Sequence, residues 1–441
     1  MKQKIKNLAI VGILFSTVVS FKAASLLSDE LVKPLNNTIV LEWNEIAFKA
    51  FDGPNYQHPL LASRINAMMH IAMHDAINGV DAKYERYAFT GNDRGADPVA
   101  AASAAAYQVL LYEIPGKKAF LDSALQETLN SIAAGDAKKK GIALGKAAAN
   151  QLIKLRTNDG SAGEVMAKLP TSRGSSTFVS LSSSASAELP GIYQLVPPFD
   201  FLFAPHWEHV NLFSLQSKNQ FRPGPYPLLE SDEYAKDFNE VLQAGRITSS
   251  LRTEDQTSYT KFWYEFSEAG WNRVAREAVK NKSLDLFETA RLFALVNIAL
   301  ADSYIAGWDA KMYYNFWRPY TAIHHAAVDG NDKTIPVADW EPAEPTPPVQ
   351  DYPSTHSALG NAAATVLASI LGDETSFTMT SYTAIPAGTT RSFKSFSEAA
   401  NENAESRIMA GIHFRFSCKA GQDLGNNIGH WVVEKYLKPI K

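Results

Sequence analysis

The chain has very little cysteine and no excess of charge of either sign. Cys418 is the single cysteine among 441 residues, so no disulfide can form within the chain and a structural zinc site lacks its usual ligands. Lys and Arg number 42 against 46 Asp and Glu, which gives a formal net charge of -4. Without a basic excess we expect no nucleic-acid partner, and any anion site must come from a local group of cations.

Apolar residues, in contrast, are abundant and follow a helical pattern. They make up 46% of the chain, too many for a disordered protein, and recur at steps of three and four residues. The longest such stretches are near 65–80, 288–314 and 357–371, whereas strand-like runs are short, as around 380–385. The pattern predicts an all-α protein with few or no strands.

The first 25 residues have the layout of a secretory signal peptide. Lys2, Lys4 and Lys6 precede an apolar run over 8–19, and small residues follow at 23–25. The run is shorter than the roughly 20 apolar residues of a spanning helix, and we expect no spanning segment beyond it. The sequence therefore predicts an exported protein, periplasmic or extracellular, that is not an integral membrane protein after cleavage.

Two segments resemble each other and indicate an internal repeat. The segments that begin at 63 and 290 share an Arg, two Asp and a Lys at matching positions, which amphipathicity alone does not require; the pairs are Arg64 with Arg291, Asp75 with Asp302, Asp81 with Asp309 and Lys83 with Lys311. We predict two related helical bundles packed together, over 26–165 and 231–441, joined by a Ser/Pro-rich region over 166–230. Within this plan, 171–190 and 335–353 are expected to be loops.

Two cations lie close together in the second half. Lys311 and Arg318 are seven residues apart, so two helical turns would place both on one face of a helix that Pro319 ends. Taken alone, such a pair is more typical of a solvated helix face than of a site.

Two later segments carry hydroxyl and imidazole groups. Ser354, Thr355 and His356 precede a long Ala-rich helix, whose N-terminus can cradle an anion, although a simple N-cap by Ser354 is an equal alternative. Arg407 precedes His413 by a turn and a half of a predicted helix, where a lone His is usually a packed core residue. Together with the two cations above, these side chains could hold an oxyanion and present an imidazole nitrogen to its central atom. No acidic ligand set for a hard divalent cation accompanies them.

The order and spacing of these residues resemble a known signature. Lys311 with Arg318-Pro319, then Pro353-Ser354-Thr355-His356, then Ser406-Arg407 with His413 resemble the three-part signature of vanadium-dependent haloperoxidases and type-2 phosphatidic acid phosphatases. The stretches 221–225, 316–323 and 412–416 are similar to those of the bacterial, soluble haloperoxidases.

The resemblance implies a vanadate cofactor and a role for each residue. Vanadate would be held by Lys311, Arg318, Ser354, Thr355, Arg407 and His413, with His413 as the ligand of the metal. The catalytic residues would be Lys311, His356 as general acid–base, and His413.

The implied reaction oxidises a halide, iodide or bromide in preference, with hydrogen peroxide to hypohalous acid. One alternative is a secreted acid phosphatase that acts on phosphate esters through a phosphohistidine at His413. Another is a protein that binds phosphate or vanadate without turnover. A homo-oligomer stays open in each case.

The chain departs from the signature at two positions. Thr355 stands where the family usually has Gly, so the backbone must approach the oxyanion despite a side chain. Ser417 stands where the family usually has an Asp that orients the imidazole. Either Asp423 or another acid substitutes, or His413 is a weaker ligand and nucleophile. Because loss of this carboxylate would harm a phosphohistidine mechanism more than vanadate coordination, it favours the peroxidase.

Overall fold

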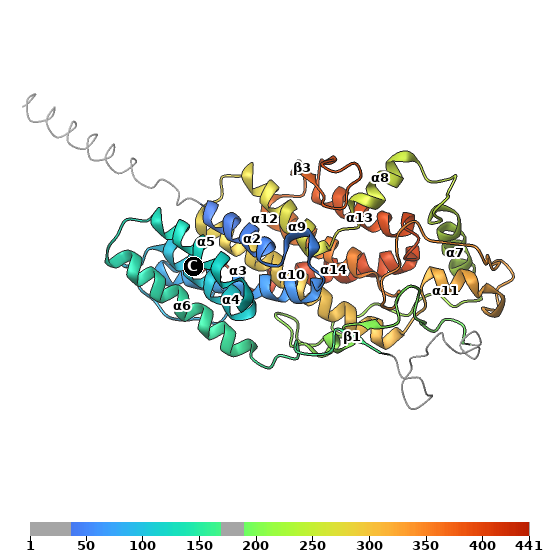
Figure 1. Ribbon diagram of the computed structural model, residues 1–441, viewed down its shortest axis with the longest axis horizontal. Helices are drawn as coiled ribbons and strands as arrows, with labels where there is room; N and C mark the ends of the chain where they lie inside the picture. Colours follow the sequence, from blue (N-terminus) through green and yellow to red (C-terminus); the bar gives the residue numbers. More distant parts are fainter. Residues whose placement is uncertain (1–36, 169–188, 441) are drawn as a thin grey trace, which may run out of the picture.

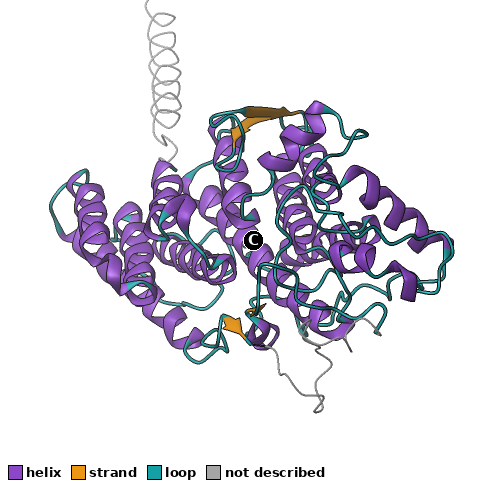
Figure 2. Cartoon of the chain, turned by 45° about the vertical axis from the view of Figure 1, so that its right-hand side comes forward, coloured by secondary structure: helices purple, strands orange, loops and turns teal. Residues whose placement is uncertain are grey.

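A computed structural model describes residues 37–168 and 189–440 as a helical protein. The predicted signal peptide and most of the predicted loop 171–190 lie outside these residues. The described helices are α2 (Thr38–Ala50), α3 (Pro59–Val80), α4 (Pro98–Glu113), α5 (Lys118–Asn130), α6 (Asp136–Arg156), α7 (Asp232–Ala244), α8 (Glu254–Phe262), α9 (Ser267–Lys280), α10 (Leu286–Tyr314), α11 (Pro319–His324), α12 (Thr355–Leu371), α13 (Phe396–Met409) and α14 (Arg415–Lys435). There are also two small antiparallel sheets, β1 (Met166–Ala167) with β2 (Leu202–Phe203) and β3 (Phe377–Thr380) with β4 (Thr390–Phe393), and short 3-10 helices at Gly53–Asn55, Pro115–Lys117, Pro205–His209 and Ala326–Val328. The all-α prediction is confirmed, as Figure 2 shows.

The helices form two groups that meet along α10. Helices α3 to α6 lie at one end of the molecule, and α7, α8 and α11 lie at the other (Figure 1). Helix α3 packs on α4 and α6, and α10 packs in the same way on α12 and α14, while α3 and α10 contact each other. The two triplets correspond to the two related bundles that the sequence predicts.

Asp75 and Asp302, which occupy matching positions in the sequence repeat, also have matching roles in the two bundles. Asp75 on α3 accepts hydrogen bonds from the backbone N–H groups of residues 87–89, at 2.7 to 2.8 Å. Asp302 on α10 accepts from the backbone N–H groups of residues 213–215, at 2.7 to 3.0 Å. Each buried carboxylate thus satisfies the backbone of a loop that crosses its helix.

Matching glycines bring the second and third helices of each triplet into close contact. A Cβ added to Gly145 on α6 would lie 2.2 Å from the carbonyl oxygen of Ala101 on α4. A Cβ added to Gly425 on α14 would lie 2.1 Å from the carbonyl oxygen of Ala358 on α12. Neither position can hold a larger residue without moving a helix backbone, so α14 lies tightly against the helix that begins at the candidate site.

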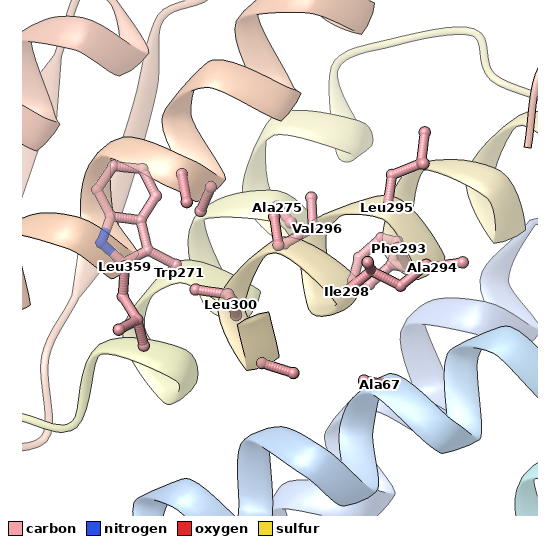
Figure 3. Packing of buried hydrophobic residues seen from close by; sticks show 14 of the residues in the cluster. Ala67, Trp271, Ala275, Phe293, Ala294, Leu295, Val296, Ile298, Leu300 and Leu359 are labelled. Carbon is pink, nitrogen blue, oxygen red and sulfur yellow. The ribbon is translucent and has the colours of Figure 1, made fainter. Parts of the chain in front are cut away.

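Helix α10 is the centre of the core. Figure 3 shows Phe293, Ile298 and Leu300 of α10 among Trp271 and Ala275 of α9, with Leu359 of α12 and Ala67 of α3 nearby. By length and composition α10 is apolar enough to cross a membrane, which corrects the expectation that no such segment follows residue 19. Its most apolar window is 94% buried within the protein, as in the core helix of a globular domain.

Two local predictions have different outcomes. Residues 335–353 contain no helix, as expected for a Pro-rich loop, but Gln350 and Asp351 within it are fully buried. The short strand expected around 380–385 lies a few residues earlier: β3 ends at Thr380, and residues 381–389 connect it to β4. Pro386 and Gly388 lie in this connection, and their turn chemistry outweighs the short apolar alternation.

Candidate active site

The two cations Lys311 and Arg318 lie together but on different elements. Lys311 is in the last turn of α10, which ends at Asn315, where φ is +47°. Arg318 is the N-cap of the next helix, α11, and Pro319 is its first residue. The prediction of one helix ended by Pro319 is therefore wrong, because proline fits the first turn of a helix, where no N–H donor is needed.

A buried loop directs both cations through its backbone. Lys311 Nζ donates to the carbonyl oxygens of Gln350 at 2.5 Å and Asp351 at 3.0 Å. Arg318 Nε donates to the carbonyl oxygen of Val349 at 2.7 Å. Three successive carbonyl groups of this loop therefore fix the two cations that α10 and α11 supply.

The segment that follows α8 holds the third cation and the second imidazole. Arg407, in the last turn of α13, donates from Nη1 to the carbonyl oxygen of Trp263 at 3.1 Å. His356 Nε2 lies 3.0 Å from the carbonyl oxygen of Glu265, which accepts its proton. The Glu265 carboxylate is itself paired with Arg273 at 2.7 Å. Sequence reasoning missed Glu265, since a backbone contact leaves no pattern in the side chains.

The start of α12 has the N-cap that its sequence predicts, and its N-terminus faces the candidate site. Ser354 is the N-cap, and its Oγ accepts from the Ser357 N–H at 3.4 Å. Thr355 is the first residue of α12 and is 7% exposed. A Cβ added to Gly307 on α10 would lie only 2.5 Å from Thr355 Cγ2. The missing side chain at Gly307 therefore provides the space for Thr355, which explains how the chain tolerates this departure from the signature.

His413 lies in the turn between α13 and α14, not on a helix as predicted. Helix α13 ends at Met409, α14 begins at Arg415, and Gly411 between them has a φ of +77°. The turn points the imidazole at the cations: Arg318 Nη1 lies 3.0 Å from His413 Nε2.

The other side of the imidazole meets a carboxylate that sequence reasoning did not single out. His413 Nδ1 lies 2.7 Å from Asp351 Oδ1, and the Ser417 hydroxyl donates to Asp351 Oδ2. Asp423 is exposed and pairs with Lys419 at 2.6 Å, so the suggestion that Asp423 substitutes for the missing acid is wrong. Asp351 is the "other acid" that the sequence left open.

Burial shifts the protonation of the site. Burial lowers the pKa of Lys311, His356 and His413 well below their usual values, and neighbouring guanidinium groups add to this effect. Burial also lowers the pKa of Arg407, to about 10, and raises the pKa of Asp351 to about 6 against the attraction of Arg318. Both imidazoles are therefore neutral at pH 7 and can each accept a proton or offer a lone pair.

The charges of the site do not balance without a bound anion. Lys311, Arg318 and Arg407 are each at most 1% exposed. Among the described residues, the carboxylate within ion-pair distance of these cations is Asp351, 3.8 Å from Arg318. Arg407 Nε is buried and has no hydrogen-bond partner. Such a donor set fits a compact oxyanion with several oxygens.

The described residues hold no group of three or more His, Cys, Asp or Glu side chains that could bind a metal ion directly. The side chains that the structure does bring together, the three basic residues and His413, are donors and a lone pair suited to an oxyanion. His70 and His74 of the first bundle are held by Asn44 and the carbonyl oxygen of Glu85.

Comparisons with known proteins point to the same chemistry. Residues 291–441 match the family model described as the VCPO second helical-bundle domain. The vanadium chloroperoxidase of Curvularia inaequalis is 26% identical over 195 residues, which are 37% of this chain and 32% of that protein. The match thus spans about a third of the length of this curated relative.

Solved structures extend the likeness to nearly the whole chain. The crystal structure of the first bacterial vanadium-dependent iodoperoxidase matches with a TM-score of 0.77 and 26% identity, over 93% of this chain and 100% of that one. A holo-type bacterial vanadium-dependent chloroperoxidase shares the fold, with a TM-score of 0.70 and 16% identity over 92% of this chain and 98% of that one. The resemblance inferred from the signature is confirmed.

Proposed function

We propose that the chain is a vanadate-dependent haloperoxidase, on the premise that residues 291–441 match the model of the second helical-bundle domain of vanadium chloroperoxidase. Its substrates are hydrogen peroxide and a halide, and its product is hypohalous acid. The likeness to a bacterial iodoperoxidase over that protein's full length supports iodide as the halide, with bromide as the other halide that we propose.

The observation that carries this proposal is the unbalanced positive charge at the buried site. The two buried guanidinium groups of Arg318 and Arg407 lie in the same site as the Lys311 amine, and in the described part of the chain the carboxylate within ion-pair distance of any of the three is Asp351, 3.8 Å from Arg318. Because an uncompensated buried charge is costly, the site gains most from an anion that accepts several hydrogen bonds. Vanadate and phosphate both meet this requirement.

The residues of the site divide the work between binding and proton transfer. Lys311, Arg318 and Arg407 would hold the oxygens of vanadate, with the Ser354 hydroxyl and the Thr355 backbone N–H as further donors. His413 would offer the lone pair of Nε2 as the ligand. When bound, vanadate supplies a Lewis-acidic centre that activates hydrogen peroxide without a change in oxidation state. Neutral His356 accepts a proton from the incoming peroxide.

An acid phosphatase that uses the same pocket is the second candidate. The same lone pair of His413 could attack phosphorus, and Asp351 next to Nδ1 could stabilise the resulting charge on the ring. The sequence argument that Ser417 disfavours a phosphohistidine fails, since Asp351 supplies a carboxylate at this position. The preference for a peroxidase therefore depends on the family and on the charge of the site.

The test compares two reactions on one preparation. The purified chain without residues 1–25 is loaded with orthovanadate and given hydrogen peroxide with iodide, bromide or chloride. A parallel sample without vanadate receives p-nitrophenyl phosphate. Vanadate-dependent oxidation of iodide or bromide that phosphate suppresses is the expected result. Phosphate ester hydrolysis that vanadate inhibits, with no halide oxidation, would make the chain a phosphatase.

The location and organisation of the protein are also proposals. The Lys-rich start and apolar run of the sequence support export to the periplasm or beyond, which mass spectrometry of the mature N-terminus in a secreting host would test. The division into 26–165, 166–230 and 231–441 predicts that limited proteolysis cuts first within 166–230. Sedimentation would show whether the chain forms a homo-oligomer.

A further inference from the structure

A buried carboxylate lies on the far side of His413 from the cations. Asp351 is fully buried, and its Oδ1 is 2.7 Å from His413 Nδ1. We propose that Asp351 is the positioning residue that orients His413, in place of the Asp that the signature has at position 417, and that Ser417 holds Asp351 in position. This inference rests on the proposed function, because it concerns how His413 presents its lone pair to vanadate.

The hydrogen bond from Arg318 determines which nitrogen of His413 carries the proton. Arg318 Nη1 lies 3.0 Å from His413 Nε2, and a guanidinium group can only donate. Nε2 must therefore be the acceptor, so the proton of the neutral ring lies on Nδ1, the nitrogen next to Asp351. This tautomer leaves the Nε2 lone pair directed toward the cations, where an oxyanion would bind.

Both the main chain and the side chain of Asp351 are held by the residues around it. Its backbone N–H donates to the carbonyl oxygen of Phe316 at 3.0 Å, and its own carbonyl oxygen accepts from Lys311 at 3.0 Å. The Ser417 hydroxyl donates to its second carboxylate oxygen. The backbone of Ser417 is in turn tied to Ser354, whose N–H donates to its carbonyl oxygen at 2.9 Å. The main chain of Asp351 is thus tied to Phe316 and Lys311, and its carboxylate to Ser417 on α14.

The contact between Ser417 and Asp351 suggests an exchange in which the acid next to the imidazole can stand at either position. The side chain at 417 meets the same carboxylate that lies 2.7 Å from His413 Nδ1, so an acid at 417 starts from a position one hydrogen bond away from that carboxylate. This chain has the acid on the loop before α12 and the hydroxyl on α14, and the exchanged arrangement would have the acid on α14 and the hydroxyl on the loop.

A positioning role of Asp351 and a merely structural one predict different effects on the binding of phosphate and of vanadate when the charge of Asp351 is removed. Removal of this negative charge makes the site more positive, so binding of phosphate by the cations should be unchanged or tighter. Vanadate differs because it needs the correctly oriented Nε2 lone pair of His413. An amide at 351 can present its NH₂ to Nδ1 and favour the other tautomer, which removes that lone pair.

The experiment measures binding of orthovanadate and of inorganic phosphate to the unloaded chain by isothermal titration calorimetry. Asp351→Asn should weaken vanadate binding by about 10- to 100-fold, the range seen when a partner of a metal-ligating His is lost, while phosphate binding stays equal or tightens. The double variant Asp351→Ser/Ser417→Asp should regain most of the vanadate affinity. Asp423→Asn, which removes an exposed carboxylate of α14, is the matched control and should change neither affinity.

The possible results are distinguishable. Equal loss of vanadate and phosphate binding in Asp351→Asn, or unchanged vanadate binding, would overturn the positioning role. Failure of the double variant to regain affinity, with a thermal melting curve like that of the unchanged chain, would overturn the exchange between 351 and 417. If the unchanged chain binds phosphate but not vanadate, the proposed haloperoxidase function fails, and the positioning role toward vanadate fails with it.

Discussion

The buried carboxylate of Glu268 should make the protein less stable as the pH rises. Glu268 on α9 is 1% exposed and accepts hydrogen bonds from the hydroxyl groups of Tyr56 and of Tyr304, the latter at 2.9 Å. Burial raises the pKa of Glu268 from 4.5 to about 7, although the two hydrogen bonds oppose this shift.

The sign and size of the effect follow from proton linkage. Between the unfolded pKa of 4.5 and the folded pKa of about 7, the folded chain binds more protons at Glu268 than the unfolded chain does. The stabilisation is therefore complete below pH 4.5 and is lost as the pH rises through 7. From about pH 5 to pH 8 the loss is about 2.5 kcal/mol, since one pKa unit corresponds to about 1.4 kcal/mol.

The assay is urea-induced unfolding of the unchanged chain and of Glu268→Gln at several pH values. Gln keeps the size of the side chain but does not titrate, so the free energy of unfolding of the variant should fall about 2.5 kcal/mol less over this range. Glu277→Gln, which removes a partly exposed carboxylate of the same helix, is the matched control. If Glu268→Gln and the unchanged chain show the same pH dependence, the argument from burial is refuted.

Three further predictions concern the site and its support. His413→Ala should abolish vanadate-dependent halide oxidation, whereas His430→Ala on the exposed side of α14 should not; retained activity in the first variant would refute the site. Gly307→Ala should displace Thr355 and lower vanadate affinity by about tenfold, and adding Thr355→Gly should restore it, as calorimetry would show. Gly425→Ala should lower the free energy of unfolding in urea by about 1–3 kcal/mol, because its Cβ would lie 2.1 Å from a backbone oxygen of α12; an unchanged or higher stability would contradict the tight contact.

The sequence predicted the elements that depend on local pattern. The three long helices are present near their predicted positions because their apolar residues recur at helical spacing over four or more turns. The structure also brings together the candidate residues, from Lys311 to His413, because their motifs lie at or next to the ends of α10 to α14, and α12 packs on α10, α13 and α14. The helices needed no knowledge of distant contacts, whereas the grouping of the site residues followed from the resemblance to the haloperoxidase signature.

The predictions that failed depend on breaks in the chain and on contacts distant in sequence. Asn315 adopts a left-handed conformation that ends α10 early, which separates Arg318 from the helix of Lys311. The role of Asp351 was missed because it lies 62 residues before His413 and contacts it only after the loop folds back. Likewise, Gly307 lies far before Thr355 in the sequence. The space that Gly307 leaves for the Thr355 side chain therefore cannot be predicted from the motif around Thr355.

The loop before α12 has a consequence for how the site can vary. Lys311 and Arg318 are fixed by the carbonyl oxygens of Val349, Gln350 and Asp351, and every amino acid has such an oxygen. Substitutions at 349 and 350 therefore leave the acceptors of both cations in place, whatever side chains they introduce. At 351 the side chain matters as well, since the Asp351 carboxylate contacts His413 and Ser417. The positions of the cations can thus persist through changes at two of the three loop residues, whereas the third is constrained by both its main chain and its side chain.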